Sequence, residues 1–422
     1  MSMTMMEAHG AYVPVRLDAD RWATRRIHRR FLVVVHTVTA GQRLLDAVRL
    51  LEGDPRIQTI FTAPPDVFSN GVEGFLEDLN GLVLPWGQAV QTRFDLALAA
   101  SHGSLYELHA PVIVLPHGAG HNKIVPGGQR GRQAGERGVY GLSRQRLVRD
   151  GTVIPEAIVL AHQEELARLG RECPEALPVA EVVGDPCFDR ITASLPSRVL
   201  YREAVQVRDR QQLVLFCSTW GGKSLLGQGW ELLERLVREL PGDEYRLALL
   251  LHPNVWNAHG EWQTLSWLAA LRRSGLTVIS QHADWVGALV SADYIVGDHG
   301  SVTLYGAMTG APVLLADVPE EDIDPASPMA ELSSLAPRLR IREGRPLRQQ
   351  LSRSSTAYRP HRYERIAARI TSEPGQFARK MRALIYRKLH LRPPAVRVAA
   401  EPAPLPFMAR YDEPGSAVSW RR

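Results

Sequence analysis

Short apolar runs alternate along this chain with longer segments in which apolar residues recur every three or four positions. The first run, residues 30–37 (RFLVVVHT), is followed by Gly41 and by a helical repeat from Leu44 to Leu51. Runs that are apolar throughout are typical of parallel strands covered by helices on both faces. Further strands are predicted in this half at residues 57–61, 82–85, 96–100, 112–115, 158–161 and 179–183.

The same alternation restarts after a polar, helical stretch at residues 200–210. Strands are predicted in the second half at residues 213–217, 246–251, 276–280, 294–297 and 312–316. Two successive arrays of this kind predict an α/β protein with two doubly wound, Rossmann-like domains that face each other across a cleft. We place these domains at residues 28–195 and 196–358, with a hinge near residues 191–210.

The sequence outside these two domains has a different character. Residues 1–27 are predicted to be a partly disordered extension, residues 359–392 to form basic helices, and residues 393–422, rich in Pro and Ala, to be a disordered tail. The helical region is basic on one face, which is either a solvated surface or a contact with anionic lipid headgroups. The residues of this face are Arg379, Lys380, Arg382, Arg387, Lys388 and Arg392.

Composition narrows the class of protein. With 422 residues, 45% of them hydrophobic and 23% charged, the chain can bury a large core in more than one domain. A formal charge of +5 suits an anionic substrate and is too diffuse for a nucleic-acid partner. No signal-peptide or membrane-spanning pattern occurs, so we expect a cytoplasmic protein, at most peripheral to a membrane. Cys173, Cys187 and Cys217 lack metal-type spacing, and we expect neither zinc nor a disulfide.

The segment from Asp298 to Thr303 (DHGSVT) carries the strongest functional signal. In open α/β sheets, ligands bind beyond the carboxyl ends of strands, where helix N-termini attract phosphate. Gly300 allows close approach of a backbone, while His299, Ser301 and Thr303 supply hydrogen-bond donors. The alternative is that Asp298 or Ser301 simply caps the following helix.

A second glycine-rich loop follows the strand at residues 112–115 and begins with His117 and Gly118. His117 is a candidate general base toward an acceptor hydroxyl, because the ordinary pKa of histidine lies near neutral pH. The alternatives are a structural histidine or a donor that orients the substrate. Lys123 is the first basic residue of this loop, which continues to about Tyr140. A metal site at His117 and His121 is not expected, since no carboxylate or cysteine lies at a matching offset.

The second domain's first loop reads STWGGKS and ends like a phosphate-binding P-loop. Cys217 stands where the full motif requires a glycine, so a P-loop ATPase or GTPase is not expected. Lys223 and the neighbouring backbone N–H groups can still hold a diphosphate, and the alternative is a plain helix start. His252, after the next strand, either reaches the same phosphates or forms a turn with Pro253.

Taken in order, these segments resemble the CDP-glycerol glycerophosphotransferases of teichoic-acid synthesis. More distantly they are similar to the UDP-N-acetylglucosamine 2-epimerases and other GT-B enzymes. The resemblance covers roughly residues 110–316 and lies in the sequence order of the motifs. These are His117-Gly118, the Gly-x-Pro-x-x-Asp turn of Gly184, Pro186 and Asp189, Ser218-Thr219-Trp220, His252-Pro253, and the strand that leads to Asp298 and Ser301.

The resemblance implies a GT-B fold, to which the sequence pattern adds the helical C-terminal extension. It also implies a donor held mainly by the second domain and His117 as the base. The donor is CDP-glycerol or a nucleotide sugar, no other cofactor is expected, and the acceptor is an unknown hydroxyl. The diphosphate is expected near Lys223, His252, His299, Gly300, Ser301 and Thr303. Further candidate contacts to donor or acceptor are Gly118, Lys123, Asp298, Thr219 and Trp220.

Three functions follow from these motifs. The first is transfer of a glycerophosphate or glycosyl group to a hydroxyl. The second is epimerisation of a sugar nucleotide, which needs carboxylates near the reacting carbons. The third is nucleotide binding without catalysis. The carboxylates available for epimerisation are Asp185, Asp284, Glu136 and Asp298.

Overall fold

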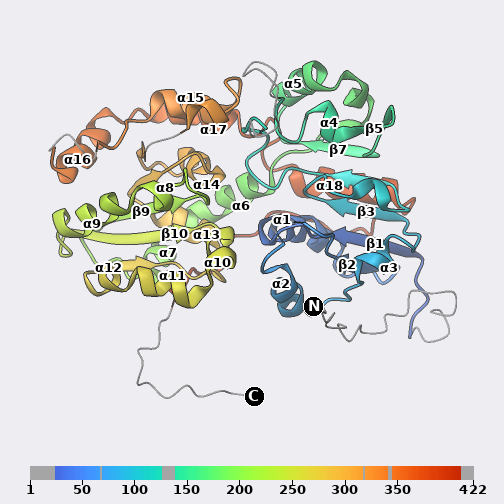
Figure 1. Ribbon diagram of the computed structural model, residues 1–422, viewed down its shortest axis with the longest axis horizontal. Helices are drawn as coiled ribbons and strands as arrows, with labels where there is room; N and C mark the ends of the chain where they lie inside the picture. Colours follow the sequence, from blue (N-terminus) through green and yellow to red (C-terminus); the bar gives the residue numbers. More distant parts are fainter. Residues whose placement is uncertain (1–23, 67–68, 126–137, 317–318, 341–344, 410–422) are drawn as a thin grey trace, which may run out of the picture.

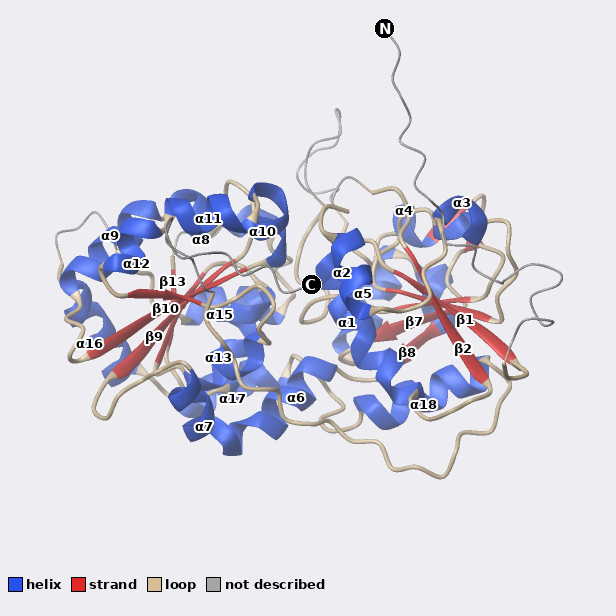
Figure 2. Ribbon diagram, turned by 90° about the horizontal axis from the view of Figure 1, so that it is seen from below, coloured by secondary structure: helices blue, strands red, loops and turns tan. Residues whose placement is uncertain are grey.

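Two α/β domains, each built on a sheet of parallel strands, lie side by side in the computed structural model (Figure 1). The structure describes residues 24–66, 69–125, 138–316, 319–340 and 345–409. Helices cover both faces of each sheet (Figure 2), as the uniformly apolar strands predict. The α/β class and the two parallel, doubly wound sheets are therefore confirmed.

The first sheet has the order β2-β1-β3-β4-β7-β8, and every pairing in it is parallel. The apolar residues of β1 from Phe31 to Val34 are fully buried. Its strands are β1 (Arg29–Val34), β2 (Ile57–Thr62), β3 (Leu96–Ala99), β4 (Val112–Val114), β7 (Ala157–Leu160) and β8 (Ala180–Val182). Its helices are α1 (Val38–Val48), α2 (Val72–Leu79), α3 (Trp86–Ala89), α4 (Arg144–Leu147), α5 (Glu164–Glu172) and α6 (Pro186–Ser194).

Two local expectations for this domain differ from the structure. Residues 82–85 form only an isolated bridge, between Val83 and Phe61, rather than a strand. A short antiparallel hairpin, β5 (Val148–Arg149) and β6 (Thr152–Val153), was not expected from the sequence pattern, because two-residue strands are too short to show a periodicity.

The second sheet has the order β11-β10-β9-β12-β13, also entirely parallel. Its strands are β9 (Gln212–Ser218), β10 (Tyr245–Leu251), β11 (Leu276–Val278), β12 (Tyr294–Gly297) and β13 (Val313–Leu315). The helices before β12 are α7 (Arg198–Ala204), α8 (Leu225–Gln228), α9 (Trp230–Glu239), α10 (Pro253–His259), α11 (Glu261–Trp267), α12 (Ala269–Arg273) and α13 (Trp285–Ser291). Those that follow are α14 (Ser301–Tyr305), α15 (Pro328–Leu335), α16 (Leu347–Ala357) and α17 (Pro360–Ala368).

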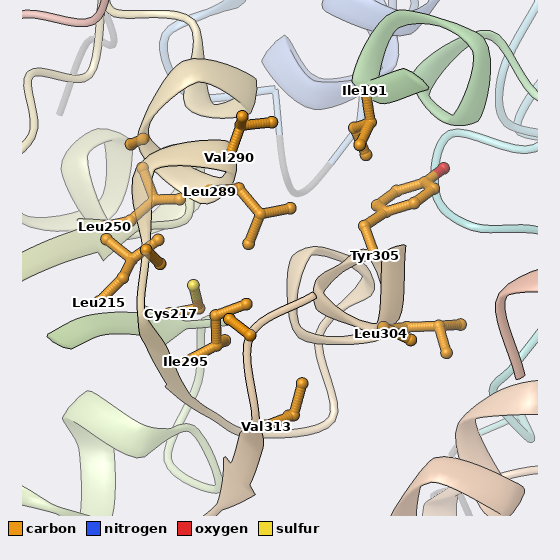
Figure 3. Packing of buried hydrophobic residues seen from close by; sticks show 14 of the residues in the cluster. Ile191, Leu215, Cys217, Leu250, Leu289, Val290, Ile295, Leu304, Tyr305 and Val313 are labelled. Carbon is orange, nitrogen blue, oxygen red and sulfur yellow. The ribbon is translucent and has the colours of Figure 1, made fainter. Parts of the chain in front are cut away.

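The join between the domains is α6. Asp185 caps this helix by accepting the Phe188 N–H at 2.8 Å, and Pro186 occupies its first turn, where a missing N–H costs nothing. Ile191 of α6 packs beside Tyr305 of α14 in the core of the second domain (Figure 3). The helix thus starts in the first domain and ends in the core of the second.

The chain crosses back to the first domain after α17. Helix α18 (Phe377–Lys388) packs on the first sheet, where Phe377 and Met381 join the core around β1 and β3 (Figure 1). Asp189 of α6 fixes the end of this crossing at the start of α18, since its carboxylate accepts the N–H groups of Gly375 at 2.6 Å and Phe377 at 3.1 Å. The Gly-x-Pro-x-x-Asp turn therefore organises the return of the chain.

The basic face of α18 lies against the first domain. Arg387 pairs with Glu181 at 2.5 Å and Lys388 with Glu156 at 2.8 Å. Lys380 pairs with Glu373, and Arg382 donates to three backbone carbonyls, those of Leu50, Pro394 and Val396. These contacts give four of the six basic residues partners within the protein, so their positions do not require a membrane. No helix in the described part of the chain is both long and apolar enough to cross a membrane.

Residues 393–409 return to the second domain in an extended conformation, which corrects the expectation of disorder there. Ala403 N–H donates to Ser194 Oγ at 2.9 Å, and its carbonyl accepts from Tyr201. Backbone bonds from Ser280 to Phe407 and from Ala409 to Val278 then add this segment to the edge at β11. An exposed strand edge can bind a segment through its backbone alone, so composition did not reveal the contact. Residues 410–422 and 1–23 lie outside the described residues.

Candidate functional site between the domains

Strands β9 and β12 are neighbours at the switch point of the second sheet: β10 and β11 lie on one side of β9, whereas β12 and β13 lie on the other. Ligands of such sheets bind at the carboxyl ends of the strands that flank this point. Asp298, which follows β12, is fully buried there. Its carboxylate accepts the N–H groups of Thr219 at 2.9 Å, Leu225 at 2.8 Å and Gly300 at 3.0 Å. Burial raises the pKa of Asp298, and these donors oppose that rise. Asp298 therefore fastens the two loops that border the site.

Helix α14 begins at this point without a side-chain cap. Gly300 is its N-cap residue and makes no side-chain hydrogen bond, so its first N–H groups are left for other partners. The loop that starts at His117 lies directly on this helix start, because Ala119 N–H donates to Ser301 Oγ at 3.2 Å. Gly118 also contacts Ser301. The two glycine-rich segments predicted for opposite domains thus meet.

The tautomer of His117 follows from its hydrogen bond. Its Nδ1 lies 2.9 Å from the carbonyl oxygen of Ala100, which can only accept, so Nδ1 carries the proton and Nε2 has a free lone pair. The ring remains accessible to solvent, yet the crowding of protein atoms around it lowers the pKa of His117 by desolvation. A neutral imidazole with an available Nε2 is what a general base requires.

Lys123 brings a positive charge between the domains. Its backbone forms an isolated bridge with Ile323 of the second domain, and the flanking bonds run from Ile124 N–H to Asp322 at 3.0 Å and from Asp324 N–H to Asn122 at 2.9 Å. Burial lowers the pKa of Lys123, while Asp298 and Asp322 raise it. The ammonium group is thus held near the switch point by the pairing of two loops.

Two further predicted histidines lie near this charge. Burial, and then the charge of Lys123, lower the pKa of His252 to about 3 and that of His299 to about 4. His252 Nδ1 accepts the Asn254 N–H at 3.1 Å, so Nε2 carries the proton and faces Thr39 of α1 at 3.4 Å. Trp220 lies beside it, with ring centroids 6.3 Å apart. His299 Nδ1 is buried without a hydrogen-bond partner.

The two other predicted diphosphate contacts, Lys223 and Thr303, differ in their surroundings. The Lys223 ammonium pairs with Glu321 at 2.9 Å and Asp322 at 2.6 Å on the exposed rim of the second domain. The Thr303 hydroxyl is enclosed beside Gly297 and has no hydrogen-bond partner. The Lys223 ammonium is still close enough to His299 for its charge to contribute to the lowered pKa of that histidine. The basic residues Arg130 and Arg132 and the carboxylate Glu136 lie outside the described residues.

A buried ionic network that local motifs did not reveal links the domains behind the site. Arg43 of α1 donates to the carbonyl of Gly118 at 3.0 Å and to the hydroxyl of Tyr305 at 3.1 Å, and it lies 3.6 Å from Asp185. The Tyr305 hydroxyl donates to Asp185 at 2.7 Å. Arg43 is 4% exposed. The sequence signal that could have identified it as a buried charge is a lone arginine within an otherwise apolar helix face.

We expect Gly118→Ala to weaken the contact between the domains. A Cβ at this position would collide with Ser301 Oγ, and overpacking of this kind costs about 1–3 kcal/mol. The melting temperature should therefore fall. Adding Ser301→Ala should restore much of it, because the new Cβ would meet only the Ser301 Cβ, 3.5 Å away. A wild-type melting temperature for Gly118→Ala alone would show that the loop adjusts freely.

No family model and no curated protein sequence matches the chain. Among solved structures, a variant of the wall teichoic acid polymerase TagF with CDPG is similar to this chain, with a TM-score of 0.57 and 13% sequence identity. The likeness covers 85% of this chain and 88% of the TagF chain. TagF itself gives a TM-score of 0.54 at 12% identity, over 86% and 89%. HepE of Anabaena in complex with UDP gives 0.48 at 13% identity, over 86% and 99%.

These likenesses concern the backbone, since so few residues are identical. The likenesses to the two TagF structures cover 85% and 86% of this chain and therefore extend over both α/β domains. The chain therefore has the GT-B fold, with two Rossmann-like α/β domains.

Proposed function

We propose that this protein is a GT-B transferase that uses a nucleotide-diphosphate donor to transfer a glycerophosphate or glycosyl group to an acceptor hydroxyl. One observation carries the proposal. His117 has its Nδ1 committed to Ala100 and its Nε2 available, and its loop lies on the uncapped start of α14. A base and an anion-binding helix end are thus brought together from two domains.

The donor diphosphate fits the chemistry around Lys123. The ammonium supplies charge, the Nε2–H of His252 supplies a neutral donor, and Gly300 leaves backbone N–H groups at α14. Lowered pKa values keep His252 and His299 neutral near pH 7, so the positive charge beside these rings comes from Lys123 and, at His299, also from Lys223. The structure of a TagF variant with CDPG is a precedent for a nucleotide donor on this fold.

In the proposed reaction, Nε2 of His117 removes the proton of the acceptor hydroxyl as its oxygen attacks the donor. With a glycerophosphate donor the attack falls on phosphorus, the new O–P bond replaces the bond to the nucleotide, and a nucleoside monophosphate leaves. With a sugar donor the attack falls on the anomeric carbon and a nucleoside diphosphate leaves. Donors directed at the phosphates stabilise the developing negative charge in either case.

Epimerisation receives less support from the available carboxylates. Asp298 is committed to three backbone N–H groups, and Asp185 to Arg43, Tyr305 and the α6 cap. Asp284 caps α13 and pairs with Arg190. The fourth carboxylate, Glu136, lies outside the described residues. Transfer needs none of these groups as a catalyst.

Donor binding is tested by a thermal-shift screen against CDP-glycerol, CDP, CMP, UDP, UDP-N-acetylglucosamine, GDP and dTDP. A donor at about 100 times its Kd stabilises the native state by about 2.7 kcal/mol, so one nucleotide class should raise the melting temperature. We expect Lys123→Ala to lose the shift. Lys223→Ala is the matched comparison, because its ammonium already has two carboxylate partners. No shift with any nucleotide would contradict the proposal.

The pH dependence of transfer should reflect His117. The base is active when neutral, and desolvation lowers its pKa from the ordinary value of 6.5. Activity should therefore persist below pH 6.5 and fall only as the pH drops through the lowered value. The measurement is a profile of kcat/KM against pH, which reports the free enzyme. An acid limb centred above pH 6.5 would exclude this histidine environment.

A further inference from the structure

A cavity of about 510 Å³ lies in the second domain, between the loop after β9 and the helices α10 and α11. This volume is within the range of small-molecule sites. The neighbouring positions of α8, α10 and α11 are visible in Figure 2. The cavity is lined by Gly221, Gly222, Ser224, Leu226, Gly227, Trp230, Val255, His259 and Trp267.

The lining is aromatic and almost free of charge. Trp230 and Trp267 supply indole rings, and Trp267 stands edge-on to His259 with ring centroids 4.9 Å apart. Trp267 is 43% exposed although it is large and apolar. His259 is the only ionisable side chain in the lining, so no lysine or arginine there would neutralise a phosphate. A neutral ligand with an apolar face suits this surface.

Another part of the lining is bare backbone. A Cβ added to Gly221 or Gly222 would meet no atom within 4 Å, so both glycines border open space. The Gly221 carbonyl already accepts the Ser224 N–H at 3.0 Å, so the groups that can bind hydroxyl groups of a ligand are the two N–H groups and the Gly222 carbonyl. The polar side chains nearby are already used, since Ser224 Oγ accepts from Gly227 and Trp230 Nε1 donates to Glu234.

The cavity faces away from the first domain. Asn257 of α10 is the residue that lies against Gly71 of the first domain, whereas Val255 and His259 line the cavity. Positions two apart on a helix point in nearly opposite directions, so α10 separates the cavity from the domain interface. A ligand here would lie roughly one helix diameter, about 10 Å, from that interface.

We propose that this cavity binds a neutral pyranose ring. The apolar C–H face of the sugar packs on the indoles, and its hydroxyls bond to the backbone at Gly221 and Gly222. Its position beyond α10 assigns it to a distal sugar of an extended carbohydrate acceptor rather than to the donor. This acceptor role rests on the proposed transferase function, whereas binding of the ring does not.

The matched variants are Gly222→Leu and Gly242→Leu. Both glycines are exposed, neither has a positive φ, and a Cβ at either meets no atom within 4 Å, so both variants should fold. Only Gly222→Leu fills the cavity. A second pair on one helix is Trp267→Ala, which removes a wall, and Trp262→Ala, whose side chain is 67% exposed and does not line the cavity.

The probes are methyl β-glucopyranoside, cytidine and octanoate, titrated separately into donor-free protein and followed by saturation-transfer NMR. We expect saturable binding of the glucoside, weakened at least tenfold in Gly222→Leu and Trp267→Ala and unchanged in the two controls. Absence of glucoside binding, equal binding in Gly222→Leu, or tighter binding of cytidine or octanoate would overturn the proposal. The donor screen is read separately, so failure of either proposal is recognised on its own.

Discussion

His117→Asn should lower kcat for transfer by about 10²–10⁴-fold, the usual contribution of a general base, while leaving donor affinity nearly unchanged. Asparagine can still donate to the Ala100 carbonyl, so the loop should keep its position, but it has no basic Nε2. The measurement is single-turnover transfer from the donor found in the binding screen, with donor Kd determined in parallel.

A matched control is His109→Asn, an exposed histidine of the same domain outside the site. It should behave as wild type in both measurements. If His117→Asn retained full kcat, another group would have to accept the proton, and the assignment of the base would be withdrawn.

The largest effect on stability is expected for Arg43→Leu. Its guanidinium and the Asp185 carboxylate are 3% and 1% exposed, and removal of one member of a buried pair costs about 3–5 kcal/mol because the other charge is left without compensation. The variant also loses the bond to the Gly118 carbonyl. Calorimetry should show a lower melting temperature, and transfer should weaken because the His117 loop is no longer held.

The double variant Arg43→Leu/Asp185→Asn separates the two causes. Asparagine retains the cap of α6 but carries no charge, so part of the lost stability should return. Activity should not return with it, since the Gly118 carbonyl still lacks its donor. Additive losses in the double variant would contradict a charge-pair explanation.

Strand positions could be predicted because most strands are buried on both faces and stand out as apolar runs. The prediction at residues 294–297 matches β12, and that at 246–251 differs from β10 by one residue. Residues 82–85 are similar in composition but pair only with the end of β2. Local composition does not show which partner an apolar segment finds, and the same reason explains the ordered residues 393–409.

The site was predictable where a residue follows a strand directly. His117, His252 and His299 all lie near the domain interface because parallel strands end at one edge of their sheet. The two lysines show the limit of this reasoning. Lys223 occupies a P-loop-like sequence yet pairs with Glu321, whereas Lys123 owes its position to backbone pairing with residue 323, distant in sequence.

Because the chain passes repeatedly between the domains, neither domain is encoded by one continuous stretch of the gene. Helix α18 and residues 393–409 are encoded after the second domain, yet they complete the first domain's core and the second domain's edge, respectively. A chimera cut at α6 would therefore combine the first domain of one protein with the α18 of the other, while the second domain would keep its own edge segment. Exchange of the second domain between two proteins of this fold requires that α18 be kept together with the first domain, although the two are far apart in the coding sequence.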